Sequence, residues 1–330
     1  MHALRVLLAS FSLLLAAVPA QAQPASTGSG QAFPTKSIRM IVGFVPGGAT
    51  DLTARVLASK LTDAFGQSVV VENRPGASGM IGAELVAKAP PDGHMLIMAT
   101  QTTHAVAPSL YRKMTYDVQR DFAPVSLVAY GPLVLVAHPS LPVRSVTELI
   151  AFIKARPGQL NFGSGGLGTS PHMSGELFNT MAGLKSQAIH YKGEAPAVIE
   201  LLGGQLPYMF ANLPTVYSYI KSGKLKGFAV TSPQRAPTAM ELPTVAESGL
   251  PGYEVFTWFG VFAPAATPRE VVGRIQAEIA KALTHPDVKE RIGGLGLVLV
   301  GNTPAQFAEF VKAELIKWAK VVKAAGVTTD

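Results

Sequence analysis

The chain has 330 residues, of which 48% are hydrophobic and 15% are charged, and its formal net charge is +7. It contains no cysteine, which excludes disulfides, thiol catalysis, zinc bound by cysteine and a lipid-modified cysteine. The Lys and Arg residues are scattered singly rather than clustered, so we do not expect nucleic-acid binding, which uses a basic patch or stripe.

Residues 1–22 have the pattern of a secretory signal peptide. Arg5 supplies the positive charge, and residues 6–18 form an apolar run shorter than the roughly 20 residues that span a bilayer. Ala20 and Ala22 then match the small-x-small site of a signal peptidase. An N-terminal membrane anchor is the alternative. We therefore expect 308 residues (330 minus 22) to be exported to the periplasm without a lipid anchor.

After a short polar leader, β-branched runs alternate with helical patterns, which predicts an α/β fold with a mainly parallel sheet. A helix is predicted after Ser145, because Ser145 and Glu148 form a capping box. In chain order the expected elements are a strand at 38–44, a helix at 50–65, a strand at 68–72, a helix at 78–89, a strand at 95–99, the helix after Ser145, a strand near 161–162, a helix at 171–182, a strand at 187–191, a helix at 194–202, strands near 208–210 and 227–230, a helix at 269–283, a strand at 297–300 and a helix at 304–324.

Two long apolar segments, 125–138 and 253–263, interrupt this alternation and suit extended chain that crosses between two lobes. We predict a discontinuous lobe 1, made of residues 34–130 and 259–330, and a lobe 2 made of residues 131–258, with a ligand cleft between them. A single-sheet enzyme with a long tail is the alternative.

The strongest local signal is the glycine turn at Gly47 and Gly48, between an expected strand and an expected helix. Glycine lets the backbone approach a ligand closely, and a helix start with free N–H groups favours an anion. Thr50 or Asp51 can cap this helix. An ordinary tight turn uses the same residues, so the sequence of the turn alone does not distinguish a ligand-binding turn from a structural one.

A second glycine-rich turn precedes the helix at 171–182, with Ser170 expected as its N-cap and Pro171 at its first position. Met173, Leu177 and Met181 are spaced to face the core. Gly163, Gly165 and Gly168 match a dinucleotide-binding pattern, but the next acidic residue on the appropriate side, Glu194, comes too late for a ribose contact. We instead expect the two helix starts to grip a carboxylate from opposite sides of the cleft.

Catalytic and metal-binding patterns are not recognisable. Ser164 lacks the leading glycine of a nucleophile elbow, because Phe162 stands there, and the histidines are dispersed. An enzyme using Ser164 or Asp51 would need a base and an orienting group that the spacing does not supply. We expect no catalytic residue, no metal and no cofactor, whereas His104 and His172 follow strand ends and could contact a ligand or simply cap the turns.

Six segments in sequence resemble the Bug family, the solute-binding subunits of tripartite tricarboxylate transporters. The similarity runs from about Phe33 to the C-terminus through the segments FVPGGATD, VVVENRPGASGMIGAELVAKAPPDGHML, THAVAPSLY, NFGSGGLGTSPHMSGELF, HYKGEAPAVIELLGGQL and LPTVAESGLPGYEVFTWFG. The resemblance implies a two-lobed periplasmic binding protein fold, type II-like, that closes on a small carboxylate and delivers it to integral membrane transporter subunits.

On matching motif positions, the resemblance implies a set of ligand-binding residues. They are Phe44, Gly47, Gly48, Ala49, Thr50, Asp51, Thr102, Thr103, His104, Ser164, Gly166, Thr169, His172 and Asn212. Asn212 has little charge near it in the sequence, and Arg74 and Lys192 are candidates to pair with a second carboxylate. We expect a monomer. A ligand-sensing receptor that feeds a two-component signalling system would have the same features and is the alternative function.

Overall fold

The computed structural model describes residues 33–294 and 296–327, so the predicted signal peptide at residues 1–22 lies outside the described residues. The strands are β1 (Ile38–Val42), β2 (Val69–Asn73), β3 (Met95–Thr100), β4 (Phe122–Ala137), β5 (Asn161–Ser164), β6 (Gln187–His190), β7 (Tyr208–Asn212), β8 (Lys226–Val230), β9 (Phe256–Pro264) and β10 (Val298–Leu299). The α-helices are α1 (Ala49–Phe65), α2 (Met80–Ala87), α3 (Ala107–Leu110), α4 (Val146–Lys154), α5 (Ser170–Ala182), α6 (Glu194–Leu202), α7 (Leu213–Lys221), α8 (Arg269–Thr284), α9 (Pro286–Val288) and α10 (Pro304–Ala325). None of the helices in this described part is long and apolar enough to cross a membrane.

The strands form a mixed sheet in the order β2-β1-β3-β9-β4-β7-β5-β6, with β8 and β10 paired to β4. β1 runs parallel to β2 and β3, and these three strands with their helices are here called the β1 half. Alternate residues of β1 face opposite sides: Met40 packs in a cluster with Leu57 of α1, and Ile41 in another with Val86 of α2. The predicted α/β fold is therefore confirmed, but the sheet is mixed rather than mainly parallel, because β4 and β9 pair antiparallel with each other and with their other neighbours.

A second parallel unit repeats this arrangement. β5 runs parallel to β6 and β7, and these strands with β8 and the helices α4 to α7 are here called the β7 half. Met209 of β7 packs in a cluster with Val198 of α6, whereas Phe210 belongs to the cluster of Phe178 on α5. Each half thus places a helix start at the carboxyl end of a buried parallel strand, the usual position of a binding site in open α/β sheets.

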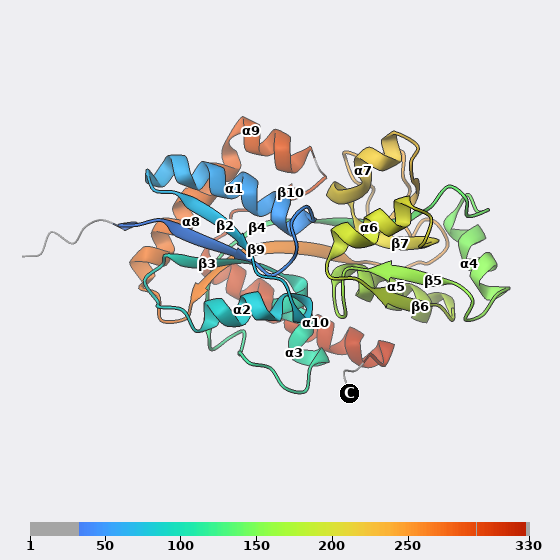
Figure 1. Ribbon diagram of the computed structural model, residues 1–330, viewed down its shortest axis with the longest axis horizontal. Helices are drawn as coiled ribbons and strands as arrows, with labels where there is room; N and C mark the ends of the chain where they lie inside the picture. The colour runs from blue at the N-terminus through green and yellow to red at the C-terminus, as the bar shows by residue number, and fades with distance from the viewer. Residues whose placement is uncertain (1–32, 295, 328–330) are drawn as a thin grey trace, which may run out of the picture. The chain divides into compact units, whose positions relative to one another are not determined.

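β4 joins the two halves and pairs with β9, and the two segments predicted to be extended are these strands. β4 pairs antiparallel with β9 from Phe122 to Pro132, and its remaining residues pair with β7 and β8. In Figure 1 the two strands run side by side from the region of β1 and β3 into the region of β5 and β7. The β1 and β7 halves are therefore continuous through β4.

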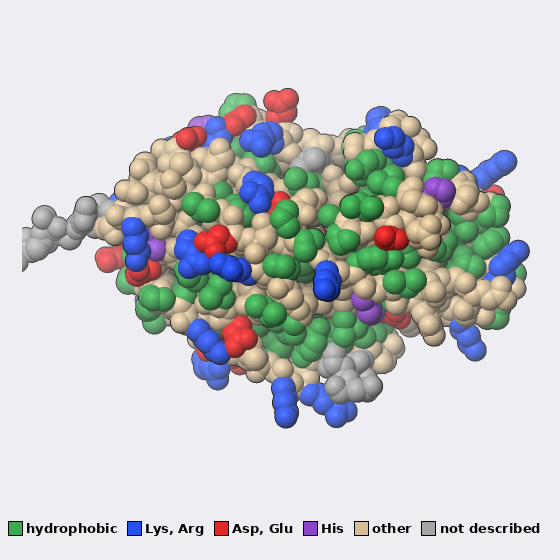
Figure 2. Space-filling model, viewed as in Figure 1, with side chains coloured by type: hydrophobic (Ala, Val, Ile, Leu, Met, Phe, Trp, Pro, Cys, Tyr) green, Lys and Arg blue, Asp and Glu red, His purple; other side chains and the backbone are tan. Residues whose placement is uncertain are grey.

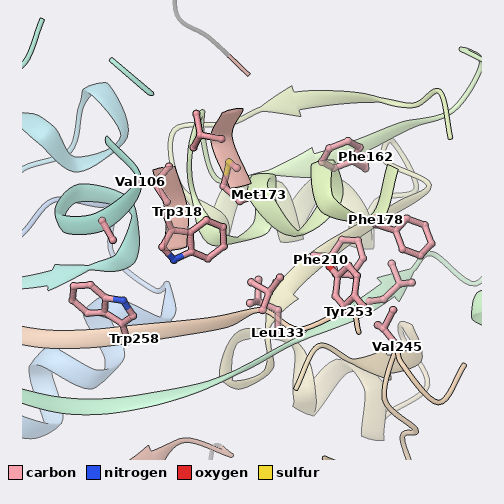
Figure 3. Packing of buried hydrophobic residues seen from close by; sticks show 14 of the residues in the cluster. Val106, Leu133, Phe162, Met173, Phe178, Phe210, Val245, Tyr253, Trp258 and Trp318 are labelled. Atoms are coloured by element: carbon pink, nitrogen blue, oxygen red, sulfur yellow. The ribbon is translucent and has the colours of Figure 1, made fainter. Parts of the chain in front are cut away.

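One hydrophobic cluster also extends across both halves. Trp318 of α10 and Trp258 of β9 lie at one end of it, and Phe178, Phe210 and Tyr253 lie at the other (Figure 3). The side-chain OH of Tyr253 donates to the backbone oxygen of Ser174, so the buried phenol has a partner. The core therefore holds α5 of the β7 half against the rest of the molecule.

Local departures from the predicted elements have local causes. The helix expected at 78–89 begins only at Met80, because Gly79 has a φ of +92° and a short 3-10 turn precedes it. Met181 is 37% exposed rather than in the core. The α-helix α7 and the helical segment at 102–110 were not predicted. Asn212 and Pro214 give α7 a recognisable start, so that signal was available in the sequence.

The cap of α4 agrees with the prediction in part. Ser145 Oγ accepts from the backbone N of Glu148, at 3.1 Å, as a capping box requires. The Glu148 carboxylate accepts from the backbone N of Arg144 rather than from that of Ser145. The start of α4 therefore has both hydrogen bonds of a capping box, but the Glu148 carboxylate accepts from the residue before the N-cap instead of from the N-cap itself.

Charged side chains are spread over the surface. On the face in Figure 2, Lys and Arg side chains lie apart from one another or next to acidic ones. Several of these are ion pairs between exposed groups, such as Lys36 with Asp92 and Arg235 with Glu247. Pairs of this kind contribute little to stability.

Candidate functional site

A cavity lies where the β1 half meets the β7 half, and its free volume is about 40 Å³. That volume holds roughly three waters at about 10–15 Å³ each. The residues that line it are Phe44, Val45, Gly48, Ala49, Thr50, Asp51, Thr100, Thr102, Gly165, Thr169, Ser170, Pro171, Glu194, Asn212 and Thr257. A larger hollow of about 450 Å³ adjoins it and shares Phe44, Val45 and Gly165.

Four helices begin at this cavity. Gly48, Thr169 and Asn212 are the N-caps of α1, α5 and α7, and Glu194 is the first residue of α6. The first N–H groups of a helix have no partner within the helix, and the helix dipole makes this end positive. The cavity is therefore suited to negative charge. It also contains buried oxygens that have no hydrogen-bond partner among the described residues, Thr100 Oγ1 and Asn212 Oδ1.

The first glycine turn is held open by Asp51. Gly47 has a φ of +89°, a conformation that favours glycine, and its backbone N donates to Asp51 Oδ2 at 3.0 Å. Arg55 Nε donates to the same oxygen at 2.9 Å, and Asn73 Nδ2 donates to Oδ1 at 2.9 Å. Burial raises the pKa of Asp51, but these hydrogen bonds outweigh it, so the pKa lies below its usual value. Asp51 is thus ionised, and its hydrogen bond from Gly47 stabilises the turn.

The predicted cap of α1 was wrong in detail. Neither Thr50 nor Asp51 accepts a hydrogen bond as an N-cap, because the N-cap is Gly48, which has no side chain. The first N–H groups of α1 are therefore not used by a side chain at the cap position. One of them, the backbone N of Ala49, instead donates to the carboxylate of Glu194 on the other side of the cavity.

The second glycine turn brings the β7 half close to the cavity. A Cβ at Gly165 would lie 3.0 Å from the backbone N of Glu194, so the turn packs directly on the start of α6. The N-cap of α5 is Thr169 rather than the predicted Ser170, and Thr169 Oγ1 donates to Gly166 O at 2.7 Å. Ser170 Oγ instead donates to Gln101 Oε1 at 3.1 Å, across to the β1 half.

Several predicted residues support these turns without lining the cavity. Ser164 Oγ is hydrogen-bonded to His190 Nδ1 at 2.7 Å. His172 Nδ1 accepts from the backbone N of Gly168 at 3.0 Å. Gly166 lines the neighbouring hollow. The contacts of Ser164 and His172 stabilise the second glycine turn without forming part of the cavity wall.

The loop after β3 also contains predicted residues that line the cavity and predicted residues that do not. Thr102 lines the cavity, whereas Thr103 and His104 point into the core, where Thr103 Oγ1 lies 2.9 Å from His104 Nδ1. The ring of His104 lies 4.6 Å from that of Phe122 and 4.4 Å from that of Phe262, and burial lowers its pKa to about 3. His104 is thus a neutral core histidine behind the wall of the site.

The structure brings together at the cavity the following predicted residues: Phe44, Gly48, Ala49, Thr50, Asp51, Thr102, Thr169 and Asn212. The predicted residues that lie outside its lining are Gly47, Thr103, His104, Ser164, Gly166 and His172. Residues that the sequence did not single out complete the wall, among them Thr100, Thr257 and Glu194.

Glu194 supplies the charge that the sequence did not show near Asn212. Its carboxylate accepts from the backbone N and from Nδ2 of Asn212, and from Thr215 Oγ1 at 3.0 Å. The backbone N of Ala49, the first residue of α1, donates to it as well. Burial raises the pKa of Glu194 above its usual value, although these hydrogen bonds oppose the shift. The carboxylate thus lies where the starts of α1, α6 and α7 meet.

Metal binding has no support in this geometry. Among residues 33–294 and 296–327, His, Asp and Glu side chains form no group of three or more that could hold a metal ion.

The fold and the site define a solute-binding protein of the periplasmic type. Over residues 53–327 the sequence matches the family described as "Tripartite tricarboxylate transporter family receptor", and the chain belongs to this family. Protein BugT of Bordetella pertussis is 40% identical over 90% of this chain and 92% of its own length. The predicted relationship to the Bug proteins is therefore confirmed.

Two solved structures are similar over nearly the whole described chain. One is described as R. palustris Rpa4515 with adipate, with 40% identity, a TM-score of 0.88, and coverage of 90% of this chain and 99% of that one. The other is the periplasmic binding protein BugD, with 36% identity, a TM-score of 0.87, and coverage of 90% and 100%. The family is thus described as a transporter receptor, and BugD as a periplasmic binding protein.

Proposed function

We propose that this protein captures a small carboxylate in the cavity and delivers it to the integral membrane subunits of a tripartite transporter. The observation that carries the proposal is the meeting of four helix starts at one cavity, through Gly48, Thr169, Glu194 and Asn212. Such starts bind anions through free N–H groups and the helix dipole. The related Rpa4515 is described with adipate, which supports a carboxylate as the ligand class.

We propose that the cavity opens to admit the ligand. A dicarboxylate such as adipate is several times larger than a water molecule, and the cavity has about 40 Å³ of free volume. We propose that lobe 1, residues 34–130 and 259–330, and lobe 2, residues 131–258, separate by bending at β4 and β9 and close again on the ligand. A ligand that contacts both lobes only when they are closed favours the closed state by that difference in affinity.

The same proposal places the protein in the periplasm as a monomer. The pattern of residues 1–22 and the similarity to a periplasmic binding protein, BugD, support export. The family description supports a membrane partner of the tripartite type.

A thermal-shift screen of the purified protein against small carboxylic acids tests the function. A ligand at a concentration 100 times its Kd adds about 2.7 kcal/mol to the free energy of unfolding, which raises Tm. We expect Gly48→Val to abolish this increase and to leave the circular dichroism unchanged. Gly48 lines the cavity, its φ of −82° suits valine, and an added Cβ meets no atom within 4 Å.

Gly273→Val is the matched control. Gly273 lies on the exposed side of α8, away from the cavity lining, and an added Cβ there also meets no atom within 4 Å. This variant should respond to ligand as the wild type does. The proposal fails if no carboxylic acid raises Tm of the wild type, or if Gly48→Val responds fully.

A further inference from the structure

Glu194 places a carboxyl group in the wall of the cavity, and the side-chain and backbone groups that contact it donate hydrogen bonds to it. Three of its hydrogen bonds come from its own side of the cleft, two from Asn212 and one from Thr215 at the start of α7. Only the bond from Ala49 comes from the β1 half. The carboxylate therefore stays with α6 and α7 when the cavity opens, and it is part of the site rather than a mobile side chain.

Asn212 presents a second acceptor beside this carboxylate. Its Nδ2 donates to Glu194 Oε2 at 2.9 Å, which fixes the orientation of the amide because a carboxylate can only accept. Asn212 is 7% exposed, and its Oδ1 has no hydrogen-bond partner among the described residues. A buried acceptor without a partner is unfavourable, so a ligand with a hydrogen-bond donor at this position would be stabilised by Asn212 Oδ1.

The lining carries no positive side chain that could balance Glu194. Among the described residues that line the cavity, none is Lys, Arg or His, and the acidic ones are Asp51 and Glu194. Asp51 is paired with Arg55, whereas the partners of Glu194 are N–H and O–H groups without a side-chain charge. Lys192 lines the neighbouring hollow and not this cavity. The corner formed by α6 and α7 thus accepts hydrogen bonds, and with Glu194 ionised it repels negative charge.

We propose that the ligand of this protein carries one carboxylate and, at its other end, an N–H donor group, an ammonium or a primary amide, which binds Glu194 and Asn212. The inference rests on the proposed function and specifies its ligand class. The carboxylate lies at the starts of α1 and α5, and the nitrogen lies at the corner of α6 and α7.

A dicarboxylate fits this corner less well. Its second carboxylate would lie next to that of Glu194 and would leave Asn212 Oδ1 without a donor. Like charges held close together in a buried site disfavour ionisation of both. A protonated Glu194 could instead donate to a second carboxylate, and a preference for dicarboxylates at neutral pH would show that this alternative holds.

Titration calorimetry of the wild-type protein at neutral pH tests the inference. The ligands are succinate, glutarate and adipate, each compared with its monoamide and with the ω-amino acid of the same chain length. We expect the amide or the amino acid to bind at least about tenfold more tightly than the matched dicarboxylate. Equal or tighter binding of the dicarboxylate at every length overturns the inference and leaves the proposed function intact. Absence of binding by the whole panel overturns both.

Glu194→Gln provides a second, independent measurement. Glutamine keeps the size of the side chain, removes its charge and adds an N–H donor. We expect this variant to gain at least about tenfold in affinity for the dicarboxylate and to lose a similar factor for the ω-amino acid. Glu200→Gln is the matched control, because Glu200 lies on the same helix and does not line the cavity. An unchanged ligand preference in Glu194→Gln contradicts the inference.

Discussion

Acidification directly tests the burial of His104. Burial lowers the pKa of this histidine to about 3 in the folded protein, and the ordinary value is 6.5. Between these two pH values the unfolded chain binds a proton that the folded chain does not bind. Protons therefore favour the unfolded state, and the stability that neutral His104 contributes at pH 7 is lost as the pH falls below about 6.5.

The size of this loss follows from the two pKa values. At pH 5 the unfolded state gains about 2 kcal/mol from protonation of this histidine, and at pH 7 it gains only about 0.2 kcal/mol. The folded state gains almost nothing at either pH, because its pKa of about 3 lies well below both. Wild-type protein should thus lose about 2 kcal/mol more than a variant without this titrating group.

Urea unfolding at pH 7 and pH 5 measures the difference with His104→Gln. Glutamine does not titrate and retains a hydrogen-bonding group for Thr103. A difference in stability between the variant and the wild type at pH 7 does not affect the test, because the readout is the change in the free energy of unfolding between the two pH values. The exposed His285→Gln should behave as wild type. If wild type and His104→Gln lose the same stability, His104 is not held neutral by burial.

Two further substitutions test local packing and capping by urea unfolding. Gly175→Ala should lose about 1–3 kcal/mol by overpacking, because the added Cβ would lie 2.1 Å from the ring of Phe162. Gly183→Ala should lose only about 1 kcal/mol through its left-handed conformation, because its added Cβ meets no atom within 4 Å, and a reversed order would contradict the packing argument. Ser145→Ala should lose about 1 kcal/mol, since Ser145 Oγ accepts from the backbone N of Glu148, and an unchanged urea midpoint would show that this cap contributes nothing.

The sequence predicted the parts of the site that depend on local pattern. The turn at Gly47 and Gly48 is recognisable because a buried strand, two glycines and an amphipathic helix follow one another in a few residues. The same holds for the turn that ends at Thr169. Periodicity and turn chemistry thus located the starts of α1, α5 and α6, of which only the first two were expected to bind the ligand, and they missed the start of α7.

The remaining parts depend on contacts between distant segments. Glu194 was predicted correctly as the first residue of a helix, but its side chain was considered only as a carboxylate too far along the chain to bind a ribose. Its role depends on Asn212, which lies 18 residues later, and on Ala49 of the other half. His104 followed a strand as a ligand-binding residue would, but Phe122 and Phe262 enclose it in the core. Local spacing does not carry such information.

The pairing of β4 with β9 has a consequence for how the molecule folds. Residues from Phe122 to Pro132 of β4 complete the sheet around β3, and residues from Leu133 to Ala137 complete the sheet around β7. Cutting the chain within β4 would leave both sheets with an unsatisfied edge, so neither half is a self-sufficient folding unit. The molecule should melt in a single cooperative transition, although its two parts resemble independent modules.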